Sequence, residues 1–163
     1  MSTARSSMSA SKGMLRFRSG FRSVVAALAT LTALAPLGGL HATVDDALSF
    51  AYEAALPYYK QGYSVRKDAW GGDLGVRDRK AVSSQLFKGN DYWFIMGTDA
   101  KGGSLSVHIY DDKGNLVESE SWQRGRFAGA RVQPKATGTY FAIVQILKSP
   151  EERTPWALVY GYK

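Results

Sequence analysis

The sequence of 163 residues contains no cysteine. It therefore cannot form disulfides, cysteine-ligated zinc or iron–sulfur sites, a thiol nucleophile or an acylated lipoprotein cysteine. Histidine is also scarce, with His41 and His108 as its two occurrences. The uncharged run Val24–Ala35 has twelve residues, whereas a membrane-spanning helix needs about 20. Hydrophobic residues make up 45% of the sequence and charged residues 21%, which is the composition of one ordinary globular domain.

Residues 1–42 have the composition of a signal peptide. Five basic residues and no acidic one lie between Met1 and Ser23, and Val24–Ala35 follows as the hydrophobic region. Pro36 and two nearby glycines then interrupt the helix, as is common shortly before a cleavage site. We predict cleavage after Ala42 and a secreted or periplasmic protein with no stable membrane insertion afterwards.

Three alternatives to this assignment stay open. The segment Met1–Ser23 holds seven serines, a composition that is also typical of an organelle transit peptide. Translation from Met14 would leave a shorter signal peptide with the same hydrophobic region. In the third alternative, Val24–Ala35 is retained as an uncleaved anchor.

The basic character of the chain belongs mainly to this segment. The whole chain has a formal net charge of +7, which alone would indicate a nucleic acid or another anionic partner. Five basic residues and no acidic one lie in residues 1–42, so the rest carries a net charge of about +2. The remaining basic clusters, at 77–80 and 124–126, are small. We therefore predict no nucleic-acid partner.

Residues 43–62 are predicted to form an N-terminal amphipathic helix. Thr43 is a suitable N-cap, and Asp45 and Asp46 follow in the first turn, where the helix dipole favours carboxylates. An apolar stripe at helical spacing is made by Val44, Ala47, Leu48, Ala51 and Ala55. Pro57 is expected to end or kink the helix near Ala55, and Gly62 to close it. We expect the stripe to lie on a sheet; docking on a partner protein is the alternative.

Residues 63–163 are predicted to form a mainly β, antiparallel, jelly-roll-like sandwich. Polar and apolar residues alternate, and turn residues recur every eight to twelve positions without a second helical pattern. The expected strands are Tyr63–Arg66, Leu74–Val76, Val82–Phe87, Tyr92–Thr98, Leu105–Tyr110, Leu116–Trp122, Ala130–Gln133, Thr139–Leu147 and Trp156–Tyr162. Gly71 and Gly72 are expected to lie in the turn between the first two.

The segment Asp111–Asn115 is the best-defined turn. It fits a type I turn with Gly114 in the left-handed conformation of a bulge. The cross-strand pairs that follow are Tyr110 with Leu116, His108 with Glu118, and Ser106 with Glu120. In this register the core receives Leu105, Val107 and Ile109, and the outer face receives Ser106, His108 and Tyr110.

Three turn motifs stand out between residues 80 and 147. Gly89–Tyr92 precedes an apolar run, Tyr110–Asn115 reads YDDKGN, and Pro134–Tyr140 ends in TGTY. Together they resemble the bacterial pre-peptidase C-terminal domain, a small β-sandwich found on many secreted proteins. Members of that family usually accompany a protease, and some bind calcium or an extracellular polymer. The present chain has no room for a protease domain, so the resemblance implies a free-standing module or one with a separate partner.

Aromatic residues are frequent, with 18 among the 121 residues after position 42. The apolar runs around Trp93, Phe94, Tyr140 and Phe141 are expected to place these four side chains in the core. Trp122 shares the outer phase of its hairpin with other aromatic and charged residues, unless the helix or a loop covers it. Trp70 precedes a Gly-Gly pair. The resulting candidates for ligand binding are Tyr110, His108, Glu118, Trp122 and Trp70.

Catalytic and metal-binding interpretations find little support. A triad of Ser106, His108 and Glu118 would need the serine to face the base, but it lies parallel to His108 without a nucleophile elbow. Glu118 and Glu120 lie about 7 Å apart on one strand face, yet they point the same way instead of flanking a bond. The carboxylates of Asp111–Asn115 suit a weak calcium site, but turn formation explains them. We predict no catalytic residue, metal or cofactor.

The sequence therefore supports two functional hypotheses. The first is a small, exported, non-catalytic binding module that contacts a glycan or a cell-envelope protein through the outer face of its hairpin. The second is a structural or accessory subunit that docks through its N-terminal helix. An envelope hydrolase that depends on His108 is an outside alternative.

The signal-peptide assignment makes a direct prediction about the mature N-terminus. N-terminal sequencing of the exported protein should find Thr43 or a near neighbour as the first residue, because Ala42 is the small residue that signal peptidases accept. A mature chain that retains Val24–Ala35 would contradict the assignment and favour the uncleaved anchor.

Overall fold

The computed structural model describes residues 43–163, so the predicted signal peptide and its cleavage after Ala42 lie outside the described residues. Within this range a helix, α1 (Val44–Lys60), precedes eight strands. The strands are β1 (Ser64–Leu74), β2 (Arg79–Leu86), β3 (Tyr92–Gly97), β4 (Ser104–Tyr110), β5 (Glu120–Arg124), β6 (Phe127–Val132), β7 (Gly138–Lys148) and β8 (Thr154–Tyr162). Helix α1 is neither long nor apolar enough to cross a membrane.

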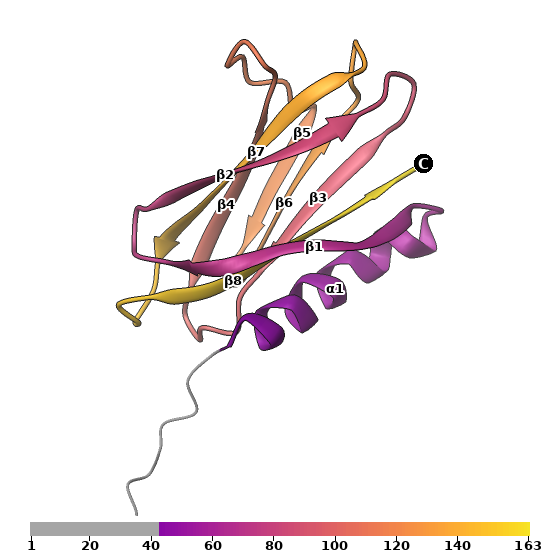
Figure 1. Ribbon diagram of the computed structural model, residues 1–163. Coiled ribbons are helices and arrows are strands. Elements are labelled where there is room, and N and C mark those ends of the chain that lie inside the picture. The colour runs from indigo at the N-terminus through magenta and orange to yellow at the C-terminus, as the bar shows by residue number, and fades with distance from the viewer. Residues whose placement is uncertain (1–42) are drawn as a thin grey trace, which may run out of the picture. The chain divides into compact units, whose positions relative to one another are not determined.

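The strands form two antiparallel sheets that pack face to face (Figure 1). Sheet A has five strands in the order β1-β8-β3-β6-β5, and sheet B has three in the order β2-β7-β4. Helix α1 packs on the outer face of sheet A, so the layers are the helix, sheet A and sheet B. The predicted antiparallel β-sandwich with one N-terminal helix is confirmed.

Helix α1 begins as the sequence predicts and ends later. The Asp46 amide donates to the Thr43 side chain at 3.1 Å, which caps the helix. Pro57 was predicted to end or kink the helix near Ala55; it lies inside the helix, which continues to Lys60, so the helix does not end there. The missing proline N–H removes one hydrogen bond of the helix, and one further turn is tolerated. Gly62, at φ 89°, then lets the chain reverse as expected.

Small residues allow α1 to lie very close to sheet A. The helix buries Ala47, Ala51 and Ala55 against the sheet, which confirms that the apolar stripe packs inside the domain. On the sheet side stands Gly97, where an added Cβ would lie 2.5 Å from the backbone nitrogen of Ala51. Because the missing side chains set the distance between helix and sheet, this contact leaves little room for any larger residue.

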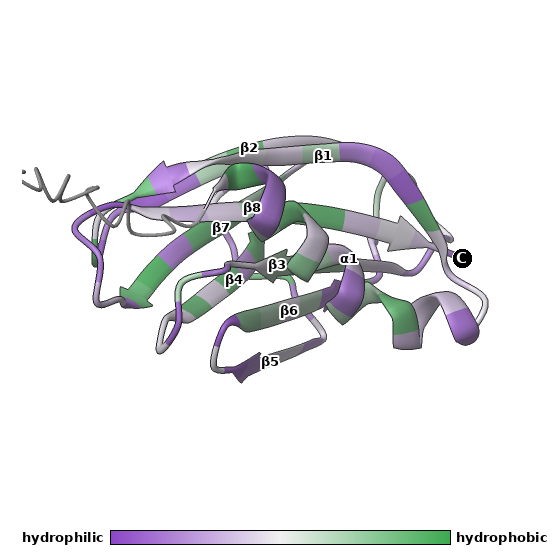
Figure 2. Ribbon diagram, turned by 90° about the horizontal axis from the view of Figure 1, so that it is seen from below, coloured by the Kyte–Doolittle hydropathy of each residue, from purple (hydrophilic) through white to green (hydrophobic). Residues whose placement is uncertain are grey.

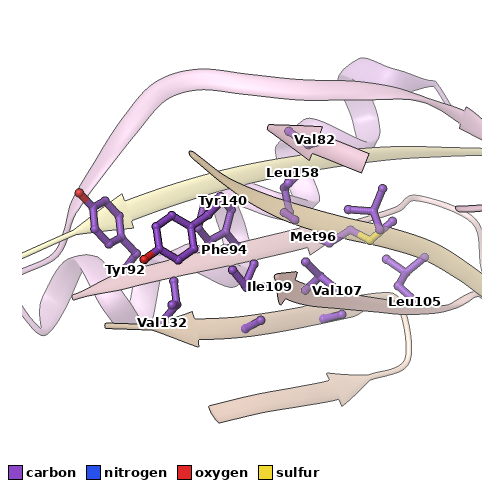
Figure 3. Close-up of a cluster of buried hydrophobic side chains, with 14 of the residues drawn as sticks. Val82, Tyr92, Phe94, Met96, Leu105, Val107, Ile109, Val132, Tyr140 and Leu158 are labelled. Carbon is purple, nitrogen blue, oxygen red and sulfur yellow. The ribbon is translucent and has the colours of Figure 1, made fainter. Parts of the chain in front are cut away.

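The main core lies between the two sheets. Figure 3 shows side chains from both sheets meeting there, among them Phe94 and Met96 of β3, Ile109 of β4 and Leu158 of β8. Leu105, Val107 and Ile109 are buried, as the predicted alternation requires. Strand β7 carries hydrophobic residues on both faces, which colours much of it green in Figure 2. One of its faces enters this core, and the other is the outer face of sheet B.

Two predicted features of the strands are wrong. Gly71 and Gly72 form no turn, because β1 continues through them and pairs with Ala157 and Trp156 of β8. The glycines are explained by close packing instead: a Cβ on Gly71 would lie 2.6 Å from Val44, and Gly72 lies beside the Trp156 ring.

The predicted strand Leu116–Trp122 is also not continuous. The turn before it forms as predicted, with Gly114 at φ 80° and a bridge between Tyr110 and Leu116. The chain then leaves β4 of sheet B and enters sheet A, where β5 begins at Glu120. Glu120 therefore pairs with Arg131, and the expected pair with Ser106 does not form.

A partly buried ion pair ties the C-terminus to the sheet. Asp91 accepts hydrogen bonds from Arg131 Nε at 2.9 Å and from the Tyr63 hydroxyl at 2.8 Å. Its backbone exchanges two hydrogen bonds with Lys163. Burial opposes the charged form of Asp91, but the hydrogen bonds from Arg131 and Tyr63 outweigh it and hold the pKa of this carboxyl below its usual range.

Replacement of Gly97 by alanine should destabilise the fold by roughly 1–3 kcal/mol, because the new methyl group meets the backbone of α1. The matched control is Gly138→Ala at the start of β7, where nothing lies within 4 Å of an added Cβ. Urea denaturation of both variants checks this. Equal free energies of unfolding for the two variants would contradict the proposed packing constraint.

Candidate functional site

The five residues that the sequence singles out do not form one surface. His108 and Tyr110 lie on the outer phase of β4 in sheet B, and Glu118 follows in the segment that crosses between the sheets. Trp122 lies on β5 of sheet A, and Trp70 lies on β1 of the same sheet. The predicted hairpin face that joins Trp122 to Tyr110 is therefore not assembled.

Trp122 is held under the helix. Its indole N–H donates to the hydroxyl of Tyr58 of α1 at 2.7 Å, and its ring lies directly over Gly129. This is the arrangement that the sequence analysis named as the alternative, in which the helix covers the side chain. The physical reason is the crossing of the chain before β5, which moves Trp122 to the sheet that carries α1.

Trp70 lies on the other side of sheet A. Its ring lies 5.5 Å from the ring of Tyr160 of β8, tilted by 36° to it, and packs against the main core. The aromatic row continues from Tyr160 to Phe94, also at 5.5 Å. Trp70 thus faces the core between the two sheets, and sheet B lies between it and the outer face that carries His108 and Tyr110.

Glu118 and His108 meet as the predicted register requires. The His108 Nδ1 atom lies 3.0 Å from a carboxylate oxygen of Glu118, and the Ile109 amide donates to the other oxygen at 3.0 Å. The Glu118 side chain is only 9% exposed. Through its bonds to His108 and Ile109, its carboxylate links the crossing segment to the edge of β4. Ser106, expected on the outer surface, is buried. Its side chain is short and lies between two longer ones: Gln145, its partner on β7, and His108, two residues further along β4.

The outer face of sheet B is the sheet surface that α1 leaves uncovered. We call it the open face, and the ladder registers place on it Arg79, Ala81, Ser83, Phe141, Ile143, Gln145, Ser106, His108 and Tyr110. Ile143 lies between Ala81 and His108, and Phe141 lies between Ser83 and Tyr110. An open depression of about 520 Å³ is lined by Arg79, Ala81, Tyr110 and Ile143. Its centre is therefore apolar and aromatic, with charge only at its margin.

Phe141 and Ile143 are the functional candidates that the sequence analysis missed. Phe141 was expected in the core together with Trp93, Phe94 and Tyr140; those three are buried, whereas Phe141 is half-exposed on the open face. The signal was present in the alternation: Ala142, Val144 and Ile146 fill the inner phase of β7, so the residues between them must face outward.

A groove of about 740 Å³ adjoins the crossing segment. Its walls come from residues 111–119 on one side and from residues 132–136 with Tyr140 on the other. Glu118 and Leu116 are among the lining residues, and Leu116 is 56% exposed. Lys113 and Lys135 contribute positive charge. The groove and the open face therefore meet at the pair of Glu118 and His108.

The Asp111 carboxylate stabilises the turn of the hairpin through hydrogen bonds. Asp111 Oδ1 accepts from the amides of Lys113 at 3.0 Å and Asn115 at 2.8 Å, and its Oδ2 accepts from the Asn115 side chain. The Asn115 side chain and backbone lower the pKa of Asp111 through these bonds. Within residues 43–163, no cluster of three or more metal-ligating side chains is found.

Comparisons with known proteins give a likeness among solved structures. No family model matches the chain, and no curated protein matches its sequence. The fold is similar to the crystal structure of a periplasmic inhibitor of g-type lysozyme from Aeromonas hydrophila, with 15% identity and a TM-score of 0.45. The match covers 63% of this chain and 90% of that chain. A likeness at this level assigns neither family nor function, and the resemblance to the pre-peptidase C-terminal domain stays a prediction.

Removal of the Glu118 carboxylate should destabilise the domain. Glu118→Ala leaves the Ile109 amide without its partner, so we expect a loss of roughly 1–3 kcal/mol in the free energy of unfolding. The control is Glu120→Ala, since Glu120 is 57% exposed and lies 3.5 Å from Arg131; this change should cost at most about 1 kcal/mol. Urea denaturation at pH 7 measures both, and a larger effect at Glu120 would refute the role given to Glu118.

Proposed function

We propose that the protein is an exported, non-catalytic binding module whose open face contacts a protein of the cell envelope. The observation that carries this proposal is the asymmetry of the two outer sheet faces. The centre of sheet A is covered by α1, whereas Tyr110, Phe141 and Ile143 on the open face are partly exposed. A partner that covers these side chains would remove apolar surface from water, which favours association.

The composition of the open face fits a protein partner. Tyrosine, phenylalanine and isoleucine lie near the centre, and serine, glutamine and arginine surround them. An apolar aromatic centre with a polar rim is the usual anatomy of a protein interface. Arg79 is held by the Gln145 side chain at 3.2 Å, so its charge lies at a fixed position on that rim.

The alternative in which α1 docks on a partner has less support. Its apolar stripe of Ala47, Ala51 and Ala55 is buried in the domain, so removal of the helix would expose the sheet beneath it. Leu56 and Tyr59 remain exposed on its far side and are the apolar residues through which a docked α1 would make contact. The outside alternative of a hydrolase would need Ser106 to reach a substrate, and this side chain is buried.

Site-specific photo-cross-linking in the cells that export the protein tests the open face. A cross-linking amino acid at Ser83, exposed on the open face, should capture an envelope protein, whereas the same group at Glu53 on α1 should not. With that partner purified, Ile143→Lys should weaken binding at least about tenfold, because it buries a charge at the centre of the interface. The control is Leu56→Lys on the exposed side of α1, which should leave the affinity unchanged.

Two results would overturn the proposal. One is capture from Glu53 but not from Ser83, which would favour docking through α1. The other is binding of a purified envelope polysaccharide, weakened by Ile143→Lys, without any protein captured from Ser83. That result would assign the open face to a glycan.

A further inference from the structure

A small cleft opens near the end of β2, where Gln85 follows Ser83 on the same side of the strand. It has a volume of about 200 Å³ and is lined by Arg66, Gln85, Phe87, Asn90, Tyr92, Tyr160 and Tyr162. We call it the tyrosine cleft. Sites for drug-sized ligands occupy about 300–1,000 Å³, so this cleft has room for a ligand of about one six-membered ring.

Tyr92 supplies a hydrogen-bond donor to this cleft. Its hydroxyl oxygen accepts from the Phe87 amide and from the Asn90 side chain, both at 3.0 Å. With both lone pairs used, the hydroxyl proton remains to be donated, and no acceptor for it is found within residues 43–163. The Tyr92 side chain is only 2% exposed, and Figure 3 shows its hydroxyl pointing away from the core cluster. An unpaired donor on a buried side chain is costly unless a ligand or water accepts from it.

Arg66 and Tyr160 add further donors to the cleft, beside the amide oxygens of Gln85 and Asn90, which are acceptors. Burial raises the pKa of Tyr160 further above neutral pH, so its hydroxyl keeps its proton. The guanidinium of Arg66 is 48% exposed at the mouth, pairs with Asp68 at 3.2 Å through one of its nitrogens and also interacts with Tyr162. Its remaining N–H groups can donate to a ligand oxygen, and a ligand carboxylate would share the guanidinium with Asp68.

Aromatic rings form the walls. Tyr92 and Tyr162 lie 5.9 Å apart, and Tyr160 lies between Phe94 and Trp70 in the aromatic row. At the rim, Phe87 is 55% exposed although it is a large apolar side chain. Such rings offer flat apolar surfaces with polar edges. The C–H face of a sugar ring packs on surfaces of this kind, while its hydroxyl oxygens accept hydrogen bonds at the edge.

We propose that the tyrosine cleft binds a single carboxylated sugar ring, such as a uronic acid unit of an acidic glycan. Arg66 binds the carboxylate, and the hydroxyls of Tyr92 and Tyr160 donate to ring oxygens. The cleft shares no residue with the open face, so the two sites are tested by different variants. A failure at one leaves the other unaffected.

Titration of the purified, ¹⁵N-labelled protein with sodium glucuronate tests the site by NMR. The Phe87 amide donates to the Tyr92 hydroxyl and therefore reports directly on it. We expect the Phe87 and Asn90 signals to shift with a Kd on the order of 1–10 mM, as for a single small ring. Glucose should bind at least about fivefold more weakly, because it lacks the carboxylate that Arg66 recognises.

Two variants of the same strand separate specific recognition from general charge. Arg66→Gln should weaken glucuronate binding at least about fivefold, whereas Lys67→Gln removes an equal charge from the neighbouring residue outside the cleft and should leave it unchanged. Both side chains are exposed, so neither change threatens the fold. Equal shifts with sodium acetate would show an adventitious ion only and overturn the proposal. It would also be overturned by preferential binding of N-acetylphenylalanine, or by no shift at Phe87 with glucuronate.

Discussion

The close approach of helix α1 to sheet A is the contact on which the rest of the structure depends. It requires alanine along one side of the helix and glycine at position 97 of β3, because any Cβ at Gly97 would meet the backbone of Ala51. Under the helix, the centre of sheet A is buried on both faces, as β3 shows with all six residues buried, whereas the outer strands β1 and β5 stay largely exposed. Sheet B receives no such cover. The two sheets of one small domain thus have different tasks, one structural and the other open to solvent.

The crossing of the chain after the Asp111–Asn115 turn decides which side chains reach each sheet. A simple hairpin would keep Trp122 beside Tyr110, but β5 joins β6 in sheet A and takes Trp122 with it. Glu118 lies at the crossing and stays bonded to β4 through the Ile109 amide. Its carboxylate therefore holds the crossing segment against β4 of sheet B. This explains why a charged side chain is nearly buried at a place where turn residues surround it.

The sequence predicts local structure well and fails where partner strands are chosen. The N-cap at Thr43, the left-handed Gly114 and the burial of Leu105, Val107 and Ile109 on β4 follow from short-range chemistry, and the structure confirms each. The role of Gly71 could not be predicted, because its small size serves a contact with Val44, far away in the sequence. The same holds for the binding residues: the predicted cluster needed Trp122 and Tyr110 in one sheet, and strand order is a long-range property. The outward position of Phe141 could have been predicted, because Ala142, Val144 and Ile146 already occupy the core-facing side of β7.

The two proposed sites bind through different interactions, and the net charge of the domain does not reveal this difference. After residue 42 the chain is close to neutral, at about +2, so neither site attracts its ligand through the field of the whole domain. The open face depends on apolar area with charge at its rim, whereas the tyrosine cleft depends on unpaired donors beside one guanidinium. Salt should therefore affect them differently: it screens an exposed arginine and leaves apolar contact unchanged or stronger. If both proposals hold, one domain binds an acidic glycan and a protein through different interactions, and neither site needs the other to form.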